Sequence, residues 1–389
     1  MRLADYCTEA EWKKIRDVAD SKETPLLVVD LEIIKQKFEE LTGCFPMAKV
    51  HYALKANPGV PVVELLRDLG SSFDIASIFE LNRVLDTGVP PDRVSYGNTI
   101  KKAAHIKYAF EKGIRLFATD SKADLQSIAD NAPGSKIFVR ILVEGGETAE
   151  WPLSRKFGCQ PDMAIDLLVT AKQLGLVPHG ISFHVGSQQK DIAVWDAALS
   201  KVKYMFDWMK LEEDIELKMI NMGGGFPANY ISEVNPINVY AEEIRRYLHD
   251  DYGDNLPEII LEPGRSLVGE SGVLVSEVVL ISRKSRTDLN RWVYLDVGLF
   301  QGLMETMGES IKYPIYMEKL EGNPPTGTVV LAGPTCDSTD IMYENSNYQL
   351  PLNLAVGDRL YWMTTGAYTN SYSSVEFNGF PPLKTFYVK

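Results

Sequence analysis

The segment VHYALKANPGVPVVELLRDLG, residues 50–70, contains a strand followed by a helix. Its opening, VHYALKA, is mostly apolar, as in a buried strand, and PVVELLRDLG repeats apolar residues at helical spacing before a terminal glycine. This alternation continues through the first two thirds of the chain, where PDMAIDLLVTAKQLG and INVYAEEIRRYLHD are further helix candidates. The eight strand candidates begin at Val50, Ser72, Arg93, Arg115, Ile137, Gly180, Lys218 and Ile259.

Eight units of strand and helix predict an α/β fold with a (β/α)8 TIM-like barrel over residues 33–268. An open, doubly wound sheet is the alternative arrangement of such units. Beyond Gly272 the pattern changes to strand-like runs separated by turn residues, which predicts a second, mostly β domain. This domain would comprise residues 269–389 together with residues 1–32, whose last segment, TPLLVVD, would pair with it.

The composition bears on the classes of partner that this chain can have. Hydrophobic residues make up 45% of the 389 residues and charged residues 24%, as in ordinary globular proteins. The net charge of −13 argues against nucleic acid and against an anionic membrane surface, because both attract clustered Lys and Arg. A small cationic substrate is compatible with an acidic protein of this kind.

The cysteines Cys7, Cys44, Cys159 and Cys336 are scattered, without a CxxC pair or a zinc-like spacing. We therefore expect neither a disulfide framework nor a metal site. The N-terminus lacks the apolar segment of a secretory signal, and no run of eighteen apolar residues occurs in the chain. These features predict a soluble, cytoplasmic protein with reduced thiols.

Two of the strand ends carry a lysine and a histidine. Active sites of (β/α)8 barrels are built where the strands end, and Lys55 in HYALKANP and His184 in SFHVGSQ stand at such positions. A lysine there can form a Schiff base with an aldehyde, and a surface lysine lying along apolar neighbours is the alternative. The His184 ring can lie on the face of an aromatic cofactor, and a structural histidine is the alternative.

Two further strand ends offer groups that bind an anion or hold a proton. The backbone of Gly223, Gly224 and Gly225 can wrap around an oxyanion, and a plain turn is the alternative. In EPGR, Glu262 can hold a proton on a pyridine nitrogen and Arg265 presents a fork suited to phosphate, with a structural ion pair as the alternative. Four such strand ends in one barrel together indicate a phosphate-bearing aldehyde cofactor, pyridoxal 5′-phosphate.

The second domain contributes two polar segments of interest. GPTCDSTD places Cys336 and Asp337 among Gly, Pro and small polar residues, which is an unusual setting for a buried structural cysteine. TTGAYTNSY places Tyr368 in a glycine-flanked turn, from which its hydroxyl can reach a phosphate. Ordinary loop chemistry is the alternative for both segments.

With these motifs in order, the sequence resembles the alanine-racemase-fold (fold type III) decarboxylases that use pyridoxal phosphate, and within them the ornithine/lysine decarboxylases. The resemblance runs from about Thr24 to the C-terminus. Any one of its motifs is weak, but the ordered set is specific: ALKAN, FDIAS, FHVGS, GGGFP, EPGR, GPTCDS and GAYT.

The resemblance implies a role for each residue that matches a motif. Lys55 would form the Schiff base with the cofactor, His184 would stack on its ring, and Glu262 would bond to the pyridine nitrogen. Glu80 would belong to the polar network that supports the lysine and the ring. The residues implied to bind the cofactor are Lys55, Asp74, Arg140, His184, Ser187, Gly223, Gly224, Gly225, Glu262, Gly264, Arg265 and Tyr368.

The resemblance also assigns roles to the second domain. Cys336 would protonate the substrate carbon after CO2 has left, which makes it the fourth catalytic residue beside Lys55, His184 and Glu262. Asp337 would bind the distal ammonium of the substrate. In this family the active sites are shared between the subunits of a head-to-tail homodimer, so Cys336, Asp337 and Tyr368 would serve the partner's site.

The implied activity is the decarboxylation of L-ornithine, and also of L-lysine, to putrescine and cadaverine, a step of polyamine biosynthesis. Relatives that act on diaminopimelate resemble GPxCES, whereas Asp337 in GPTCDS fits a substrate with a bare distal ammonium. The biosynthetic arginine decarboxylases of the family look similar but are much longer. A second interpretation of the motifs is an amino-acid racemase of the same fold, and a third is a catalytically dead homologue that binds a regulatory protein.

Two positions depart from the pattern of many eukaryotic ornithine decarboxylases. Those relatives have DGVY where this chain reads VGLF, so Phe300 stands in place of a tyrosine. An aspartate of their specificity helix aligns with Glu309, beside Ser310. Phe300 and Glu309 are therefore predicted substrate-binding residues, and they leave the choice between ornithine and lysine open.

Overall fold

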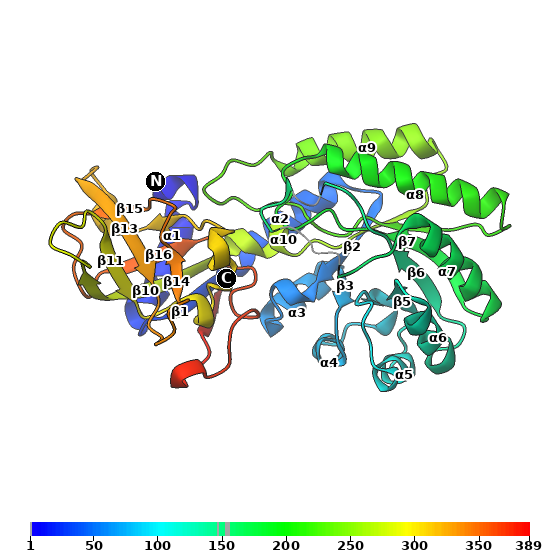
Figure 1. The fold of residues 1–389 in the computed structure, drawn as a ribbon, viewed down its shortest axis with the longest axis horizontal. Helices are drawn as coiled ribbons and strands as arrows, with labels where there is room; N and C mark the ends of the chain where they lie inside the picture. Colours follow the sequence, from blue (N-terminus) through cyan, green and yellow to red (C-terminus); the bar gives the residue numbers. More distant parts are fainter. Residues whose placement is uncertain (1, 146–147, 152–155) are drawn as a thin grey trace. The chain divides into compact units, whose positions relative to one another are not determined.

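The computed structural model describes residues 2–145, 148–151 and 156–389 (Figure 1). The chain divides into two compact units. The barrel unit comprises residues 35–227 and 235–264, and the β unit comprises residues 1–34, 228–234 and 265–389.

The barrel unit is a closed barrel of eight parallel strands, each of which pairs with its neighbours along the sequence. The strands are β2 (Ala48–Ala53), β3 (Ser72–Ile75), β4 (Val94–Tyr96), β5 (Leu116–Thr119), β6 (Lys136–Arg140), β7 (Val177–Ser182), β8 (Met219–Asn221) and β9 (Glu258–Leu261). All eight contain residues of the predicted strands. The last strand, β9, pairs with β2, and this closure excludes the open doubly wound sheet.

The helices of the barrel unit lie outside the ring of strands (Figure 1). A buried apolar stripe on one face joins each helix to the strands, as in α7, where Ala164, Leu167, Leu168 and Ala171 are buried. The helices are α2 (Leu31–Cys44), α3 (Val60–Asp68), α4 (Ile78–Asp86), α5 (Ala103–Glu111), α6 (Lys122–Asn131), α7 (Pro161–Gln173), α8 (Ala193–Leu211) and α9 (Ile237–Tyr252).

The inside of the barrel is filled by side chains that alternate along each strand. Ala118, Phe138, Met219 and Ile260, from four different strands, form a buried apolar cluster there. Charged and polar side chains on the same strands lie two residues before or after this cluster, as Lys136 and Arg140 do around Phe138. The apolar layer therefore separates two polar ends of the barrel interior.

The β unit is built on a nine-stranded sheet, with the helix α1 (Glu9–Ser21) at the N-terminus and the short helix α10 (Arg265–Val268) before β10. Its β1 runs antiparallel to β10, which confirms that TPLLVVD pairs with the second domain. Ile15 and Ala19 of α1 pack with β-strand residues in one buried apolar cluster. The strands are β1 (Leu26–Asp30), β10 (Gly272–Ser282), β11 (Arg291–Leu295), β12 (Ile315–Tyr316), β13 (Thr326–Ala332), β14 (Ile341–Tyr343), β15 (Gln349–Pro351), β16 (Arg359–Met363) and β17 (Lys384–Val388).

The helix α1 begins at a capping box, a start signal that hydrophobic periodicity alone does not reveal. The Thr8 hydroxyl accepts a hydrogen bond from the Glu11 backbone, and the Glu11 carboxylate accepts one from the Thr8 backbone. This reciprocal arrangement marks a helix start in the sequence. Among the described residues, no helix combines the length and the apolar character needed to cross a membrane.

Candidate active site

Five predicted site residues of the barrel unit lie at the carboxyl ends of its strands. Lys55 follows β2, Asp74 is near the end of β3, Arg140 ends β6, His184 follows β7 and Glu262 follows β9. Parallel strands of a barrel end on one rim, where barrel enzymes place their chemistry. The influence of these charges on one another's pKa values shows that the structure brings them together.

Asp74 is the most crowded carboxyl group of this cluster. Burial raises its pKa well above the usual value, and the nearby Glu262 and Glu80 carboxylates raise it further, whereas Lys55 opposes them. Gly97, just after β4, leaves the space for this carboxylate, because a Cβ there would clash with Asp74 Oδ1. Asp74 is therefore confined by its neighbours and its charge depends on Lys55.

Glu80 lies in the first turn of α4 and is tied to the turn before that helix. Its Oε2 accepts the backbone N–H of Ala76 at 2.6 Å, and its own backbone N–H donates to Ser77 Oγ. Burial raises the pKa of Glu80, and the Ala76 hydrogen bond opposes this shift. Glu80 thus fixes the chain just beyond β3 and adds a negative charge next to Asp74.

Glu262 is oriented by Asn221, a residue that sequence reasoning missed. Asn221 Nδ2 donates to Glu262 Oε1 at 2.5 Å, and Asn221 Oδ1 accepts the Gly223 backbone N–H at 2.9 Å. The Glu262 backbone N–H in turn donates to the Gly223 carbonyl at 2.8 Å. A buried Asn among the apolar residues of the strand segment MINM was the available signal.

His184 is held as a neutral ring. Its Nδ1 lies 3.0 Å from the Gly186 backbone N–H, so this nitrogen accepts a hydrogen bond and the proton sits on Nε2. Burial lowers its pKa well below the usual value, and the charges of Arg140 and Lys55 lower it further. A neutral imidazole can lie against an aromatic ring that itself carries a proton without charge repulsion.

The three glycines after β8 form a cradle that has no space for side chains. A Cβ on Gly223 would clash with the Phe183 carbonyl oxygen, and one on Gly224 would lie 2.5 Å from that of Glu262. Gly223 and Gly225 have φ of +64° and +99°, which L side chains rarely adopt. The cradle therefore presents bare backbone close to His184 and Glu262.

These residues fit pyridoxal phosphate. Lys55 would hold the aldehyde carbon, the neutral His184 ring would lie on the pyridine ring, Glu262 would face its nitrogen, and the glycine cradle would receive the phosphate. The phosphate and nitrogen ends of the cofactor thus have partners of matching chemistry. Ser187 is the predicted hydroxyl ligand on the loop after β7, and its backbone pairs with Trp151.

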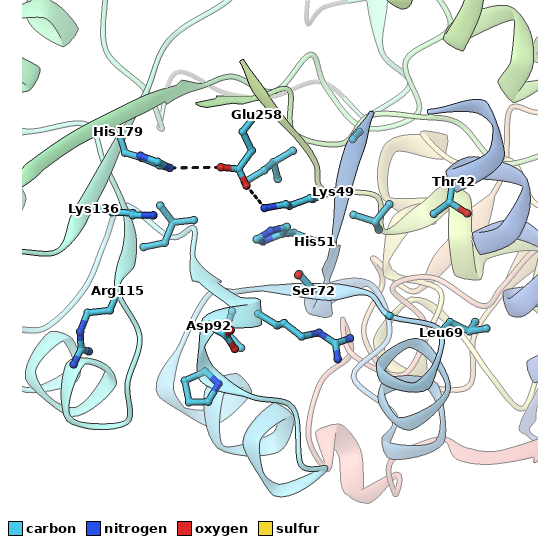
Figure 2. Close-up of a pocket in the computed structure, with 18 of the residues that line it drawn as sticks. Thr42, Lys49, His51, Leu69, Ser72, Asp92, Arg115, Lys136, His179 and Glu258 are labelled. Atoms are coloured by element: carbon cyan, nitrogen blue, oxygen red, sulfur yellow. Dashed lines mark hydrogen bonds and ion pairs between the residues drawn. The ribbon is translucent and has the colours of Figure 1, made fainter. Parts of the chain in front are cut away.

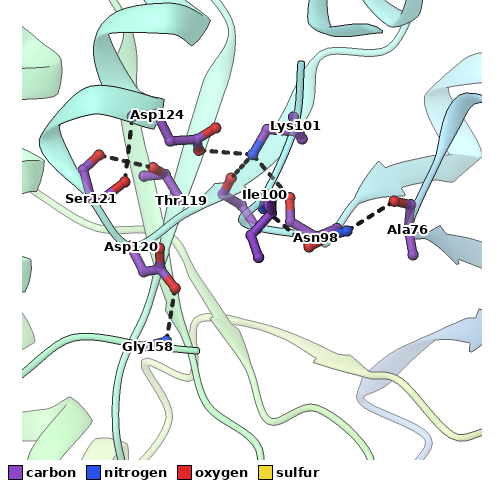
Figure 3. Close-up of polar contacts among 10 residues, drawn as sticks. Ala76, Asn98, Ile100, Lys101, Thr119, Asp120, Ser121, Asp124 and Gly158 are labelled. Atoms are coloured by element: carbon purple, nitrogen blue, oxygen red, sulfur yellow. Dashed lines mark hydrogen bonds and ion pairs between the residues drawn. The ribbon is translucent and has the colours of Figure 1, made fainter. Parts of the chain in front are cut away.

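A second polar network braces the loops beyond β3, β4 and β5 (Figure 3). The Lys101 side chain is fully buried, and its Nζ donates to the carbonyls of Asn98 and Ala118 and to Asp124 Oδ2 at 2.8 Å. Asn98 Nδ2 also donates to the carbonyl of Ala76 at 3.1 Å. Burial lowers the pKa of Lys101 and raises that of Asp124, so the pair depends on mutual attraction.

The β unit places Arg265 in a buried ion pair with Glu305, a partner that the sequence did not indicate. Arg265 Nη1 and Nη2 donate to the two Glu305 carboxylate oxygens at 2.7 and 2.5 Å, and Nη1 also donates to Tyr230 Oη at 2.8 Å. The guanidinium lies 4.9 Å from the centre of the Tyr368 ring. Arg265 therefore carries a neutralising carboxylate with it, and its predicted contact with a phosphate would have to coexist with Glu305.

Cys336 and Asp337 lie in an exposed loop that follows β13. The Cys336 backbone N–H donates to Asn378 Oδ1 at 2.9 Å. Asp337 Oδ1 accepts the backbone N–H and the hydroxyl of Thr339, and these bonds lower the pKa of Asp337. Both predicted residues are thus accessible on the surface of the β unit, with side chains available to another molecule.

Glu309 and Phe300 occupy the predicted specificity segment. Glu309 Oε1 accepts the backbone N–H groups of Glu344 and Asn345 at 2.8 and 2.6 Å, and Oε2 accepts the Ser346 hydroxyl. The Phe300 ring lies 4.6 Å from that of Phe377. The Glu309 carboxylate therefore holds residues 344–346 in this conformation, and its contact with a substrate stays a prediction.

The comparisons with known proteins agree with this geometry. Residues 31–269 match the family model "Pyridoxal-dependent decarboxylase, pyridoxal binding domain". The lysine/ornithine decarboxylase of Selenomonas ruminantium is 32% identical over 370 residues, which are 95% of this chain and 90% of that protein. The structure of the Vibrio vulnificus lysine/ornithine decarboxylase complexed with putrescine has a TM-score of 0.86 at 30% identity, covering 98% of this chain and 99% of the other.

A third relative shows that chain length does not identify the substrate. The arginine decarboxylase of Paramecium bursaria Chlorella virus, bound to agmatine, has a TM-score of 0.89 at 26% identity. The match covers 98% of this chain and 100% of that one, so chain length does not separate this chain from that arginine decarboxylase. The family model and the relatives establish that the chain belongs to the pyridoxal-dependent decarboxylases.

Proposed function

We propose that this protein removes CO2 from L-ornithine and L-lysine, giving putrescine and cadaverine, and so serves polyamine biosynthesis. One observation carries the proposal: Lys55, the neutral His184 and the Asn221-held Glu262 gather at one end of the barrel beside a glycine cradle. Relatives named lysine/ornithine decarboxylase support the choice of substrates.

The residues of the barrel unit have separate roles in such a reaction. Pyridoxal phosphate supplies an electron sink for the electron pair that the departing CO2 leaves behind. Glu262 would keep a proton on the ring nitrogen, with Asn221 fixing the direction of its carboxylate. His184 would cover one face of the ring, and the Lys55 amine would hold the aldehyde carbon. Preorganised charges of this kind cost no rearrangement during the reaction.

The residues of the β unit complete the proposal for a diamino acid. Asp337 binds the distal ammonium of the substrate, and Cys336 delivers a proton to the former α-carbon. The exposure of both residues is compatible with a homodimer in which they serve the partner's site. We also place the protein in the cytoplasm, since none of its four cysteines forms a disulfide.

A substrate panel tests the proposed reaction directly. CO2 release from ornithine, lysine, arginine and diaminopimelate should show ornithine as the better substrate and lysine as accepted, because one methylene discriminates by about 1–3 kcal/mol. Preference for arginine would assign the chain to the activity of the viral relative. Turnover of diaminopimelate, or racemisation without CO2 release, would also overturn the proposal.

The shared active site has its own test. Lys55→Ala and Cys336→Ala, each inactive in normal decarboxylation, should complement each other after subunit exchange, because each mixed dimer regains one intact site. Recovery should reach roughly a quarter of the wild-type rate with random pairing. Exchange confirmed by mass spectrometry without recovered activity would refute sharing and leave the reaction itself standing.

A catalytically dead homologue is the alternative from another class of protein. Such a protein would lack the absorbance of a bound cofactor and would release no CO2 from any amino acid. The set of Lys55, Cys336 and Asp337 favours the enzyme. Absorption spectra after incubation with pyridoxal phosphate separate the two functions before any kinetic work.

A further inference from the structure

Two buried polar residues of the barrel strands lie in a hydrogen-bonded arrangement with Asp74. His51 lies on β2 and Ser95 on β4, and both are buried. Asp74 pairs in register with Ser95 on one side and with Ala53 on the other. Because side chains alternate along a strand, His51, two residues before Ala53, points to the same face as Asp74 and Ser95.

These residues form a hydrogen-bonded chain that ends on Asp74. His51 Nδ1 lies 3.0 Å from Ser95 Oγ, and Ser95 Oγ lies 3.3 Å from Asp74 Oδ1. The Ser95 hydroxyl donates its single proton to Asp74 Oδ1, so the His51 Nδ1–H donates to Ser95 Oγ. Burial lowers the pKa of His51 to about 4, which keeps the ring neutral near pH 7.

The other side of His51 faces a hollow at the amino ends of the strands (Figure 2). This hollow has a volume of about 750 Å³, and Lys49, His179 and Glu258 line it together with His51. Lys49 Nζ donates to Glu258 Oε1 at 2.6 Å, so the two charges nearest the imidazole largely offset each other. The chain His51–Ser95–Asp74 thus spans the apolar layer from this hollow to the candidate site.

We propose that Ser95 and His51 are positioning residues for Asp74: the hydroxyl holds the carboxylate ionised and oriented toward Lys55, and the imidazole holds the hydroxyl. The inference rests on the proposed function, in which Asp74 supports Lys55. The groups that act on the Asp74 charge come from every neighbouring element. The Glu262 and Glu80 carboxylates oppose ionisation, whereas Lys55, Arg140 and the Ser95 hydroxyl favour it.

The consequence is a defined dependence on pH. Loss of the Ser95 hydroxyl removes a hydrogen bond from the ionised form of Asp74, so Asp74 binds its proton up to a higher pH. Lys55 then faces a neutral group over a wider range of acidic pH. Removal of one hydrogen bond to a charged acceptor corresponds to a shift of about one pH unit.

The test compares four variants with a matched control. Ser95→Ala should move the acid limb of kcat/KM for decarboxylation upward by about one pH unit, with cofactor affinity changed less than about threefold. His51→Phe should move the acid limb in the same direction by a smaller amount. Ser95→Thr and His51→Asn should leave the acid limb at its wild-type position, because each keeps a hydrogen-bond donor. Ser135→Ala is the control: its buried hydroxyl lies in the same barrel unit and has no hydrogen-bond partner among the described residues, and the limb should not move.

A second readout does not need catalysis. The destabilisation of the full chain by Ser95→Ala, measured by urea unfolding, should grow as pH rises, because the lost bond matters only when Asp74 is ionised. The destabilisation caused by Ser135→Ala should be independent of pH. An unmoved acid limb and a pH-independent destabilisation in Ser95→Ala would overturn the inference. Equal effects in Ser135→Ala would overturn it too. If the wild-type protein releases no CO2, the proposed function is wrong. The urea unfolding measurements then still show whether the Ser95 hydroxyl bonds to the ionised Asp74 carboxylate.

Discussion

The two ends of the barrel carry charged side chains of both signs and use them differently. At the carboxyl ends of the strands, Asp74, Arg140 and His184 are enclosed, and the charges there shift one another's pKa values. At the amino ends, Lys49 and Glu258 line a hollow of about 750 Å³ and form an ion pair whose side chains are 66% and 32% exposed. The hollow has room for a small molecule, but water screens its charges.

The hollow at the amino ends and the proposed site at the carboxyl ends differ in more than volume. What distinguishes the carboxyl end is the burial of interacting charges next to bare backbone in a conformation that only glycine adopts easily. Such an arrangement has a cost in stability, which a structural role alone does not require. Matched residues from the two ends should therefore respond differently to the same substitution.

The largest difference is expected between two lysines of β2 and its following turn. Lys55→Ala should abolish turnover and the absorbance of bound cofactor, because the covalent anchor is lost. Lys49→Ala, at the hollow, should keep both. Spectra and CO2 release from the two variants test this, and normal turnover in Lys55→Ala would show that another residue holds the cofactor.

Two ion pairs should differ strongly in their contribution to stability. Lys101→Met removes the partner of buried Asp124 and should cost about 3–5 kcal/mol of unfolding free energy. Lys49→Met removes the exposed partner of Glu258 and should cost about 0–1 kcal/mol. Urea denaturation measures both, and equal losses would mean that burial does not distinguish the pairs.

The neutral His51 predicts how stability depends on pH. Its folded pKa of about 4 lies below the ordinary value of 6.5, so the unfolded chain binds the proton first as pH falls. Stability should therefore drop from about pH 6.5 to pH 4 by up to about 3 kcal/mol from this residue. Unfolding at several pH values should show a smaller drop in His51→Phe. An unchanged pH dependence in that variant would rule out the effect.

The smallest contrast concerns two glycines. Gly224→Ala places a Cβ 2.5 Å from the Glu262 carbonyl oxygen and should cost about 1–3 kcal/mol of stability and weaken cofactor binding. Gly43→Ala meets nothing within 4 Å and should leave cofactor binding unchanged. Titration of each variant with pyridoxal phosphate measures the difference, and tight binding by Gly224→Ala would argue against the cradle.

The sequence predicted the features that repeat locally. Strand and helix periods identified all eight barrel strands, and polar residues at their ends drew attention to Lys55 and Glu262. Contacts between residues far apart in the chain were not predictable from one sequence. Asn221 reaches Glu262 across 41 positions, and Glu309 is held by residues 344–346, which no local pattern indicates.

The position of the cofactor-bearing lysine decides which end of the barrel holds the chemistry. Borohydride reduction of the protein loaded with pyridoxal phosphate fixes the cofactor to the lysine that holds it, and tryptic peptide mapping identifies that residue. The structure predicts the added mass within VHYALKANPGVPVVELLR, at Lys55, which trypsin then fails to cleave. A cofactor found on Lys49 or Lys136, at the hollow, would place the chemistry at the opposite end of the barrel and contradict the proposed site.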